Sequence, residues 1–99
     1  LIIIKRTNQL KTATHIDYLE ISASLNIHTY NYDEALRIYK EILTIQENRV
    51  GKTHQDYAYA LYNFASLNYT LGNFFIAESL YKKSLLISQN LFGETHPAF

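Results

Sequence analysis

The four histidines are the side chains in this sequence best suited to hold a metal ion or to move a proton near neutral pH. His15, His54 and His96 each follow a threonine, at intervals of 39 and 42 residues, and no two histidines are four residues apart. A helical metal site needs its ligands one turn apart, so this spacing argues against one. We expect neither a metal ion nor a cofactor.

Sequence motifs of common catalytic sites are also missing. No serine lies in a Gly-x-Ser-x-Gly turn, the 3 glycines form no phosphate-binding loop, and there is no cysteine to supply a thiolate. The acidic residues are dispersed along the chain rather than grouped. We therefore expect no enzymatic activity, and we turn to the elements that could present a binding surface.

The composition indicates one globular domain, with 99 residues of which 47% are hydrophobic and 18% charged. Nine basic and nine acidic residues cancel, so the long-range field that attracts nucleic acid or an anionic membrane is missing. Purely apolar stretches such as Leu1–Ile4 are too short for a membrane span or a signal peptide. We expect neither nucleic acid nor membrane as a partner and, since cysteine is absent, a cytoplasmic location.

An internal repeat is the strongest feature of the sequence. Residues 22–57 are identical to residues 64–99 at fourteen of thirty-six positions without a gap, where chance would give roughly two or three. A period of this length is typical of units that stack on copies of themselves. The identical pairs include Leu25/Leu67, Asn26/Asn68, Asn31/Asn73, Ala35/Ala77, Tyr39/Tyr81 and Leu43/Leu85.

Each repeat reads as two antiparallel helices. In the second repeat, helical spacing of apolar residues predicts helices over 55–71 and 74–92. Gly72 can adopt the left-handed conformation that closes the first helix, and Asn73 can cap the second with its side chain. Thr53 is the expected cap of the helix over 55–71, and Thr14 with Asp17 gives the same shortened capping box one repeat earlier.

The first repeat predicts helices over 15–29 and 32–50, of which the first either starts three residues earlier than its cap suggests or is about one turn shorter than its counterpart in repeat two. Residues 1–9 read as the end of a preceding helix, although the three isoleucines would suit a strand equally well. We expect the sequence to be a piece of a longer array. The predicted division is 1–10 as the tail of a preceding repeat, 12–51 as repeat one, 53–93 as repeat two and 94–99 as the start of a third.

This pattern resembles the tetratricopeptide repeat, and its 42-residue length with the Gly-x-Thr-His-x-x-Tyr boundary resembles the kinesin light chain type. The resemblance implies an all-α fold, an α-α superhelix in which antiparallel helix pairs stack as a solenoid. The positions that carry it are Phe64, Ala65, Gly72, Phe74, Ala77 and Tyr81 in repeat two, and Ala23, Tyr32, Ala35 and Tyr39 in repeat one.

Two departures from that pattern lead to further expectations. Tyr30 lies where the turn glycine belongs, and a left-handed tyrosine costs roughly 1–2 kcal/mol, so we expect a different geometry in the first turn. Asn26 and Asn68 replace the usual tyrosine on the inner side of the first helix. Either they form hydrogen bonds across the packing of the first helices, or they lie near solvent, because a buried amide without partners costs roughly 1–3 kcal/mol.

The resemblance implies that the first helix of each pair lines a concave groove for an extended peptide or a partner's helix. A tyrosine-lined groove offers large contacts at little entropic cost, and Asn63 could hold a ligand's backbone. The alternative for each tyrosine is packing against the neighbouring repeat. The candidate groove residues are Tyr59, Tyr62, Asn63, Ser66, Tyr69 and Thr70 on the second repeat and Asp17, Glu20, Ser24, Ile27 and His28 on the first.

The predicted groove is neutral to acidic. Asp17 and Glu20 lie on its inner face, and no lysine or arginine does. Clamps that grip a C-terminal carboxylate, as chaperone adaptors do, need inward basic residues. The sequence therefore favours a partner segment that is apolar, aromatic or mildly basic.

The leading hypothesis is a non-enzymatic scaffold or adaptor that presents this groove to a peptide or partner protein. One alternative is a regulatory or sensor array inside a larger enzyme or signalling protein, which binds an intramolecular segment or small peptide; another is a purely structural spacer. Two repeats are fewer than the three usually needed. We therefore expect the isolated piece to be marginally stable or to self-associate through its exposed repeat ends.

Overall fold

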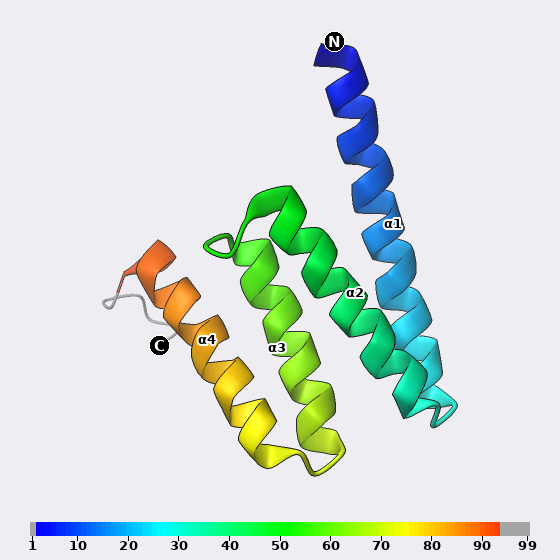
Figure 1. Ribbon diagram of the computed structural model, residues 1–99, viewed down its shortest axis with the longest axis vertical. Helices are drawn as coiled ribbons and strands as arrows, with labels where there is room; N and C mark the ends of the chain where they lie inside the picture. Colours follow the sequence, from blue (N-terminus) through cyan, green and yellow to red (C-terminus); the bar gives the residue numbers. More distant parts are fainter. Residues whose placement is uncertain (1, 94–99) are drawn as a thin grey trace. The chain divides into compact units, whose positions relative to one another are not determined.

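The computed structural model describes residues 2–93, with side chains from residue 14 onward. Its elements are α1 (Ile2–His28), α2 (Tyr32–Val50), α3 (Gln55–Thr70) and α4 (Phe74–Phe92), and all regular structure in this range is helical (Figure 1). Consecutive helices form antiparallel pairs, which confirms the all-α prediction. The chain divides into two compact units, Leu1–Ile42 and Leu43–Phe99, so α2 contributes to both.

The first unit contains α1 and the first part of α2. Its buried apolar residues recur at intervals of three and four along each helix, which places them on one face. Two of them, Ile38 and Ile42, are the largest fully buried side chains of the described residues. The buried set is Ile16, Leu19 and Ala23 on α1 with Ala35, Ile38 and Ile42 on α2.

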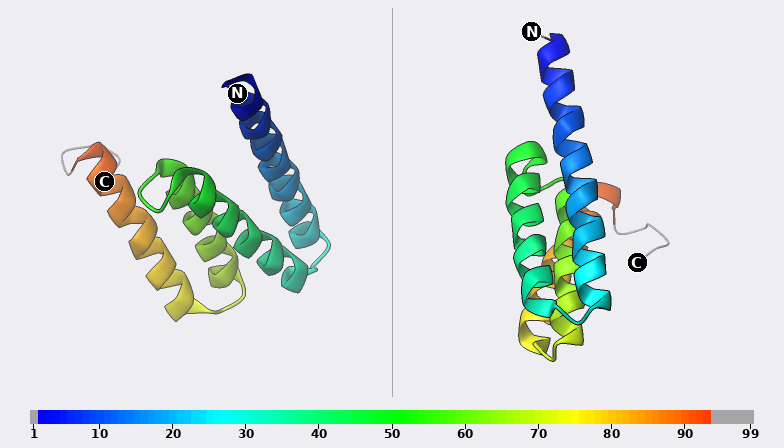
Figure 2. Two further views of the ribbon diagram at one scale, coloured as in Figure 1. Left: turned by 45° about the horizontal axis from the view of Figure 1, so that its top comes forward. Right: turned by 90° about the vertical axis from the view of Figure 1, so that its right-hand side faces the viewer.

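The second unit contains the end of α2 together with the α3–α4 pair, which Figures 1 and 2 show running antiparallel. Ala58, Ala65 and Ala77 are almost completely buried, and side chains this small let the two helices approach closely. The buried Ser84 Oγ donates a hydrogen bond of 2.7 Å to the Ala58 carbonyl, which ties α4 to the first turn of α3. This pair carries most of the predicted groove residues.

Three of the four predicted helices are observed within one residue of their expected ends. The prediction for α1 was wrong, because this helix continues without a break from Ile2 to His28 rather than beginning at His15. No glycine or proline precedes Gly51 in the chain, so nothing interrupts the helix, and Thr14 lies within it instead of capping it. The strand alternative for the isoleucines is excluded by the same helix.

The division into repeats stays a prediction. Its last part, the start of a third repeat over 94–99, lies outside the described residues.

The α3 helix begins at a different cap from the predicted one. His54, not Thr53, is the N-cap, with extended backbone angles (φ −99°, ψ 148°), and its Nδ1 accepts a hydrogen bond of 3.0 Å from the Asp56 N–H. The Asp56 carboxylate is occupied by Arg49, whose Nη2 lies 2.6 Å from Oδ2. That ion pair joins the end of α2 to the start of α3, and the predicted capping box does not form.

The two turns within the helix pairs have the same geometry, contrary to prediction. Tyr30 has φ 61° and Gly72 has φ 85°, both left-handed. The Asn31 N–H donates to the Asn26 carbonyl at 2.7 Å, and the Asn73 N–H to the Asn68 carbonyl at 2.8 Å. The Tyr30 side chain is 79% exposed, so it takes up this conformation without displacing packed neighbours. The hydrogen bonds of the turn offset the cost of the left-handed backbone.

Asn26 and Asn68 form hydrogen bonds within their own helix pairs, which neither of the two expectations included. Asn68 is buried and Asn26 half-buried, and each donates from Nδ2 to the carbonyl four residues earlier, at 2.9 Å and 2.8 Å. Each Oδ1 accepts from the asparagine five residues later, Asn73 at 3.2 Å and Asn31 at 3.0 Å. These bonds lie inside one helix pair, and they explain why Asn73 makes no side-chain cap for α4.

Candidate protein-binding surface

The predicted groove residues of α3 are accessible on the second unit. Tyr59, Tyr62 and Tyr69 are between 52% and 60% exposed. Ser66 and Thr70 are exposed and Asn63 is half-buried. Spacings of three and four residues place Tyr59, Tyr62, Ser66 and Tyr69 on one helical stripe. The stripe therefore offers aromatic surface to solvent, as a binding surface requires.

The predicted groove residues of α1 belong to the first unit. Asp17, Ser24 and His28 are exposed, whereas Glu20 and Ile27 are half-buried. His28 Nδ1 lies 2.8 Å from the Ser24 carbonyl, so this side chain folds back along its own helix. The assignment of all eleven residues to one groove stays a prediction.

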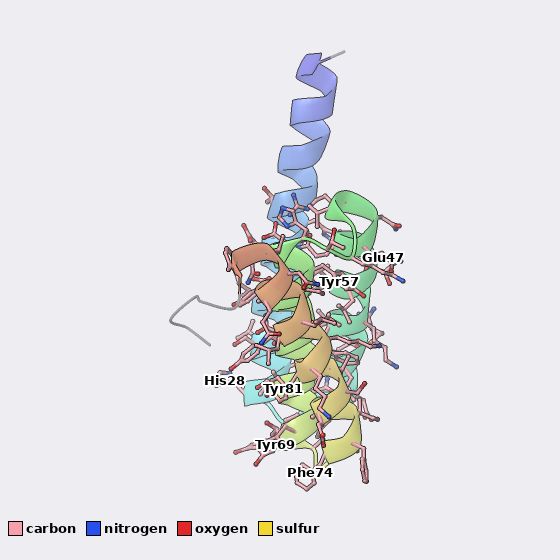
Figure 3. All side chains as sticks on the ribbon, turned by 90° about the vertical axis from the view of Figure 1, so that its left-hand side faces the viewer. His28, Glu47, Tyr57, Tyr69, Phe74 and Tyr81 are labelled. Atoms are coloured by element: carbon pink, nitrogen blue, oxygen red, sulfur yellow. The ribbon has the colours of Figure 1, made fainter. Side chains whose placement is uncertain are left out.

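Two of the three tyrosines are also packed within their own helix pair. Tyr62 meets Tyr81 of α4 edge to face, with ring centroids 5.3 Å apart, and Tyr69 meets Phe74 in the same way at 5.2 Å. Such pairs contribute about 0.5–1.5 kcal/mol each beyond the burial of area. Figure 3 shows Tyr69 and Phe74 together at the end of the pair beside its turn. These tyrosines thus have structural contacts on one edge and a solvent-facing surface on the other.

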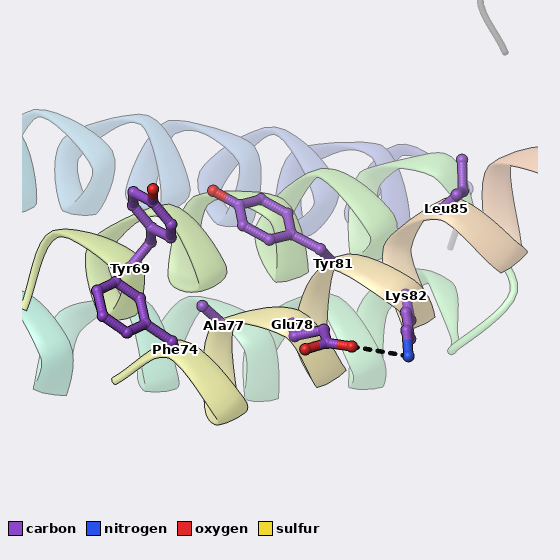
Figure 4. A pocket seen from close by; sticks show the side chains of 7 residues that line it. All are labelled: Tyr69, Phe74, Ala77, Glu78, Tyr81, Lys82 and Leu85. Carbon is purple, nitrogen blue, oxygen red and sulfur yellow. Dashed lines mark ion pairs between the residues drawn. The ribbon is translucent and has the colours of Figure 1, made fainter. Parts of the chain in front are cut away.

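A cleft of about 520 Å³ opens beside these contacts on the α3–α4 pair. Its lining is mostly apolar, and the ion pair between Glu78 Oε1 and Lys82 Nζ, 2.9 Å apart, lies at its side (Figure 4). Lys82 holds the pKa of the Glu78 carboxyl below its ordinary value, first through this hydrogen bond and then through its charge. We call this the tail cleft; it is lined by Tyr69, Phe74, Ala77, Glu78, Tyr81, Lys82 and Leu85.

Sequence reasoning missed the tail cleft. It identified Ala77, Tyr81 and Leu85 as positions of the repeat and included neither Glu78 nor Lys82 among the binding residues. The structure buries Ala77 but leaves Leu85 49% exposed. The available signal was the number of large apolar residues on α4, which exceeds what a single neighbouring helix can cover.

A second, smaller cleft of about 320 Å³ lies at the opposite end of the second unit. It is lined by residues of the α2–α3 loop and of the last turn of α4, among them Val50, His54 and Phe92. Close to it, Ser88 Oγ donates to Gln55 Oε1 at 3.2 Å. This polar contact fastens α4 to the start of α3.

Among the described residues, no three histidine, cysteine, aspartate or glutamate side chains gather as metal ligands would. Within that range, too, none of the helices combines the length and the apolar character that crossing a bilayer requires. The candidate surface is therefore defined by aromatic side chains and their hydrogen-bonding neighbours.

Antiparallel helix pairs built on a 42-residue internal repeat define a helical-repeat protein. A family model described as tetratricopeptide repeat matches residues 18–85, from the middle of α1 into α4. The chain belongs to the tetratricopeptide repeat family. No curated protein matches it. Repeats of this family generally mediate protein–protein interaction and are typically non-catalytic, so the predicted family and general class of function are confirmed.

Proposed function

We propose that this protein is a non-enzymatic adaptor that binds a peptide or a partner protein segment through the first helix of each pair, α1 and α3. The observation that carries the proposal is the half-exposed tyrosine stripe of α3, Tyr59, Tyr62 and Tyr69. Tyrosine supplies a large contact area with only two side-chain torsions to fix, and it is enriched among residues that dominate binding energy. The repeat length supports the kinesin light chain type, and the absence of cysteine supports a cytoplasmic setting.

Preorganisation favours this stripe as a binding surface. Edge-to-face contacts with Tyr81 and Phe74 restrict the rings of Tyr62 and Tyr69 before any ligand arrives. A ligand then avoids part of the cost of ordering these side chains, which is about 0.5–1.5 kcal/mol each. Asn63, which is half-buried and lies one turn after Tyr59 on α3, offers a donor and an acceptor to a ligand's peptide group.

Charge supports the kind of partner. Asp17 is exposed on α1, and the six α3 groove residues are uncharged. A C-terminal carboxylate would find no lysine or arginine among the predicted groove residues, whereas an aromatic or mildly basic segment would find tyrosine faces and the carboxylates of Asp17 and Glu20. The proposed ligand is therefore an apolar or aromatic segment with a small positive charge.

The proposal is tested with a peptide array probed with the 99-residue chain, followed by anisotropy titration of the peptides that bind. We expect Tyr62→Ala and Asn63→Ala each to weaken binding about 5- to 30-fold, the range of a residue contributing about 1–2 kcal/mol. Tyr62→Phe keeps the contact with Tyr81 and separates loss of the ring from loss of the hydroxyl. Phe75→Ala, on the most exposed large apolar side chain of α4, is the matched control.

Circular dichroism must show unchanged helix content in each variant. Unchanged affinity in both Tyr62→Ala and Asn63→Ala would remove α3 from the role proposed for it.

A further inference from the structure

An exposed apolar stripe runs along the first unit. Tyr18, Ile21 and Leu25 of α1 are each more than 60% exposed. Their spacing of three and four residues puts them on one face of the helix, over about 10 Å. We call these three residues the head stripe. They are distinct from the predicted groove residues of α1.

The internal repeat indicates that this face of a first helix is built to be covered. Leu25 and Leu67 are the same residue at equivalent positions, yet Leu25 is 62% exposed and Leu67 is 3% exposed. Tyr18 is exposed, whereas Ala60, 42 residues later, is buried. Positions of this face are therefore buried in the second repeat and exposed in the first.

At the tail cleft, equivalent residues are exposed in the second repeat and half-buried in the first. Leu43 is half-buried, and its equivalent in the cleft, Leu85, is exposed. Tyr32 is likewise half-buried, and its equivalent Phe74 is exposed. The face that is partly covered in repeat one is open in repeat two. Within the described residues, repeat one therefore leaves the head stripe exposed and repeat two leaves the tail cleft exposed.

We propose that the head stripe of one copy of this chain docks into the tail cleft of a second copy, so that copies associate head to tail. Where repeats stack, a face of the first kind meets a face of the second kind, so the two faces are complementary because both derive from the same repeated interface. This inference concerns other faces than the proposed ligand groove, apart from Tyr69, and it stands or falls separately.

The dimensions and charges are compatible with this docking. The cleft follows α4 from Phe74 to Leu85, a helical rise of about 16 Å, which accommodates the stripe of about 10 Å. Glu78 and Lys82 of the cleft pair with each other at 2.9 Å, so neither of these charges opposes the docking of an apolar stripe.

The association is weak. A fully exposed large apolar side chain presents about 200 Å², so the three residues of the head stripe offer on the order of 400 Å². The interface is then about half the standard size of about 800 Å² per partner. We expect a monomer at micromolar concentration and higher species toward about 0.5 mM, within the range of transient contacts.

Sedimentation velocity on the 99-residue chain tests the proposal through complementation. Leu25→Gln disables the head and Leu85→Gln disables the tail, and each variant alone should stay monomeric where the unaltered chain associates. A one-to-one mixture retains one intact head and one intact tail per pair, so it should form a dimer and nothing larger. Leu86→Gln alters a neighbouring leucine that is exposed but does not line the cleft, and it should associate normally.

Leu25→Ser and Leu85→Ser repeat the test with a different side chain, and circular dichroism checks helix content. Three results would each overturn the proposal: an unaltered chain that stays monomeric at about 0.5 mM, a Leu25→Gln variant that still associates, or a mixture in which the two variants do not pair. The second result would point to pairing of two tail clefts.

Discussion

The left-handed turn residue offers a test of how much strain the first helix pair contains. Tyr30 and Gly72 occupy equivalent positions, and the hydrogen bonds around them differ by only 0.1 Å, 3.1 Å against 3.0 Å for their own N–H groups. The reciprocal exchanges Tyr30→Gly and Gly72→Tyr therefore change the residue while the turn stays the same. We expect the first to raise the free energy of unfolding and the second to lower it.

The magnitude follows from three contributions. A left-handed conformation costs an L-residue about 1–2 kcal/mol, and glycine removes that cost. Glycine also makes the unfolded chain more flexible, which takes back about 0.5–1 kcal/mol. Loss of the exposed contact between Tyr30 and Tyr32, with centroids 6.2 Å apart, removes a few tenths more. The net gain for Tyr30→Gly is about 0.5 kcal/mol.

The reverse exchange should cost a similar amount. A Cβ added at Gly72 has no atom within 4 Å, so Gly72→Tyr is penalised by its backbone rather than by a clash. Urea unfolding followed by circular dichroism measures both effects as shifts of the midpoint at constant slope. In a domain of this size, 0.5 kcal/mol corresponds to roughly 2–4 °C in Tm.

Tyr30→Ala separates the contributions, because it loses the ring and keeps the left-handed cost. It should be no more stable than the unaltered chain. If Tyr30→Gly were destabilising, the tyrosine side chain would contribute more than its 79% exposure indicates, and the strain argument would be refuted.

Three further predictions concern single interactions. Asn68→Ala should lower the unfolding free energy by about 1–3 kcal/mol, because it removes two side-chain hydrogen bonds of a buried residue. Asn26→Ala, at a half-buried position, should cost less, and equal costs in urea titrations would contradict this. His54→Ala removes the cap of α3 and should cost about 1 kcal/mol by the same assay, whereas no change would show the cap to be dispensable. Lys82 lowers the pKa of the Glu78 carboxyl, so the stability from this exposed pair is present above the pKa of the unfolded chain and is lost as pH falls through the pKa of the folded protein. Glu78→Gln should therefore slightly reduce the loss of Tm with falling pH in a series of thermal melts. A larger loss of Tm in this variant would refute the assignment.

The sequence predicted the elements whose ends are marked by glycine. Gly51, Gly72 and Gly93 all have positive φ and follow helices whose last residues were predicted within one position. Apolar spacing supplied the rest, because helix pairs in a repeat must bury one face each. The start of α1 was not predictable in this way, since a threonine followed by an acidic residue caps a helix only where the preceding chain leaves the helical conformation.

The candidate surface was predicted less completely than the fold. Helical spacing sufficed to place Tyr59, Tyr62 and Tyr69 on one stripe, because those positions depend only on α3. The tail cleft depends on how α3 and α4 pack, and the exposure of Leu85 depends on whether another element covers it. Periodicity assigns a residue to the apolar face of its helix but does not show whether a neighbouring element covers that face. Leu25 and Leu67 therefore look equivalent in the sequence, although Leu25 is 62% exposed and Leu67 is 3% exposed.

The recurrence of the asparagine pairs could have predicted their hydrogen bonds, which an interpretation of each asparagine by itself did not. Asn26 and Asn31 recur as Asn68 and Asn73, so any interaction between them should recur as well. A side chain that bonds to its own helix and to the turn five residues later satisfies a buried amide without a partner from another repeat. Asparagine can make both bonds at this position, whereas the tyrosine usual in the family would have to place its ring elsewhere. The substitution therefore fixes the end of α3 from within, next to the turn where Tyr69 meets Phe74, and it stabilises one end of the proposed binding stripe before a ligand is bound.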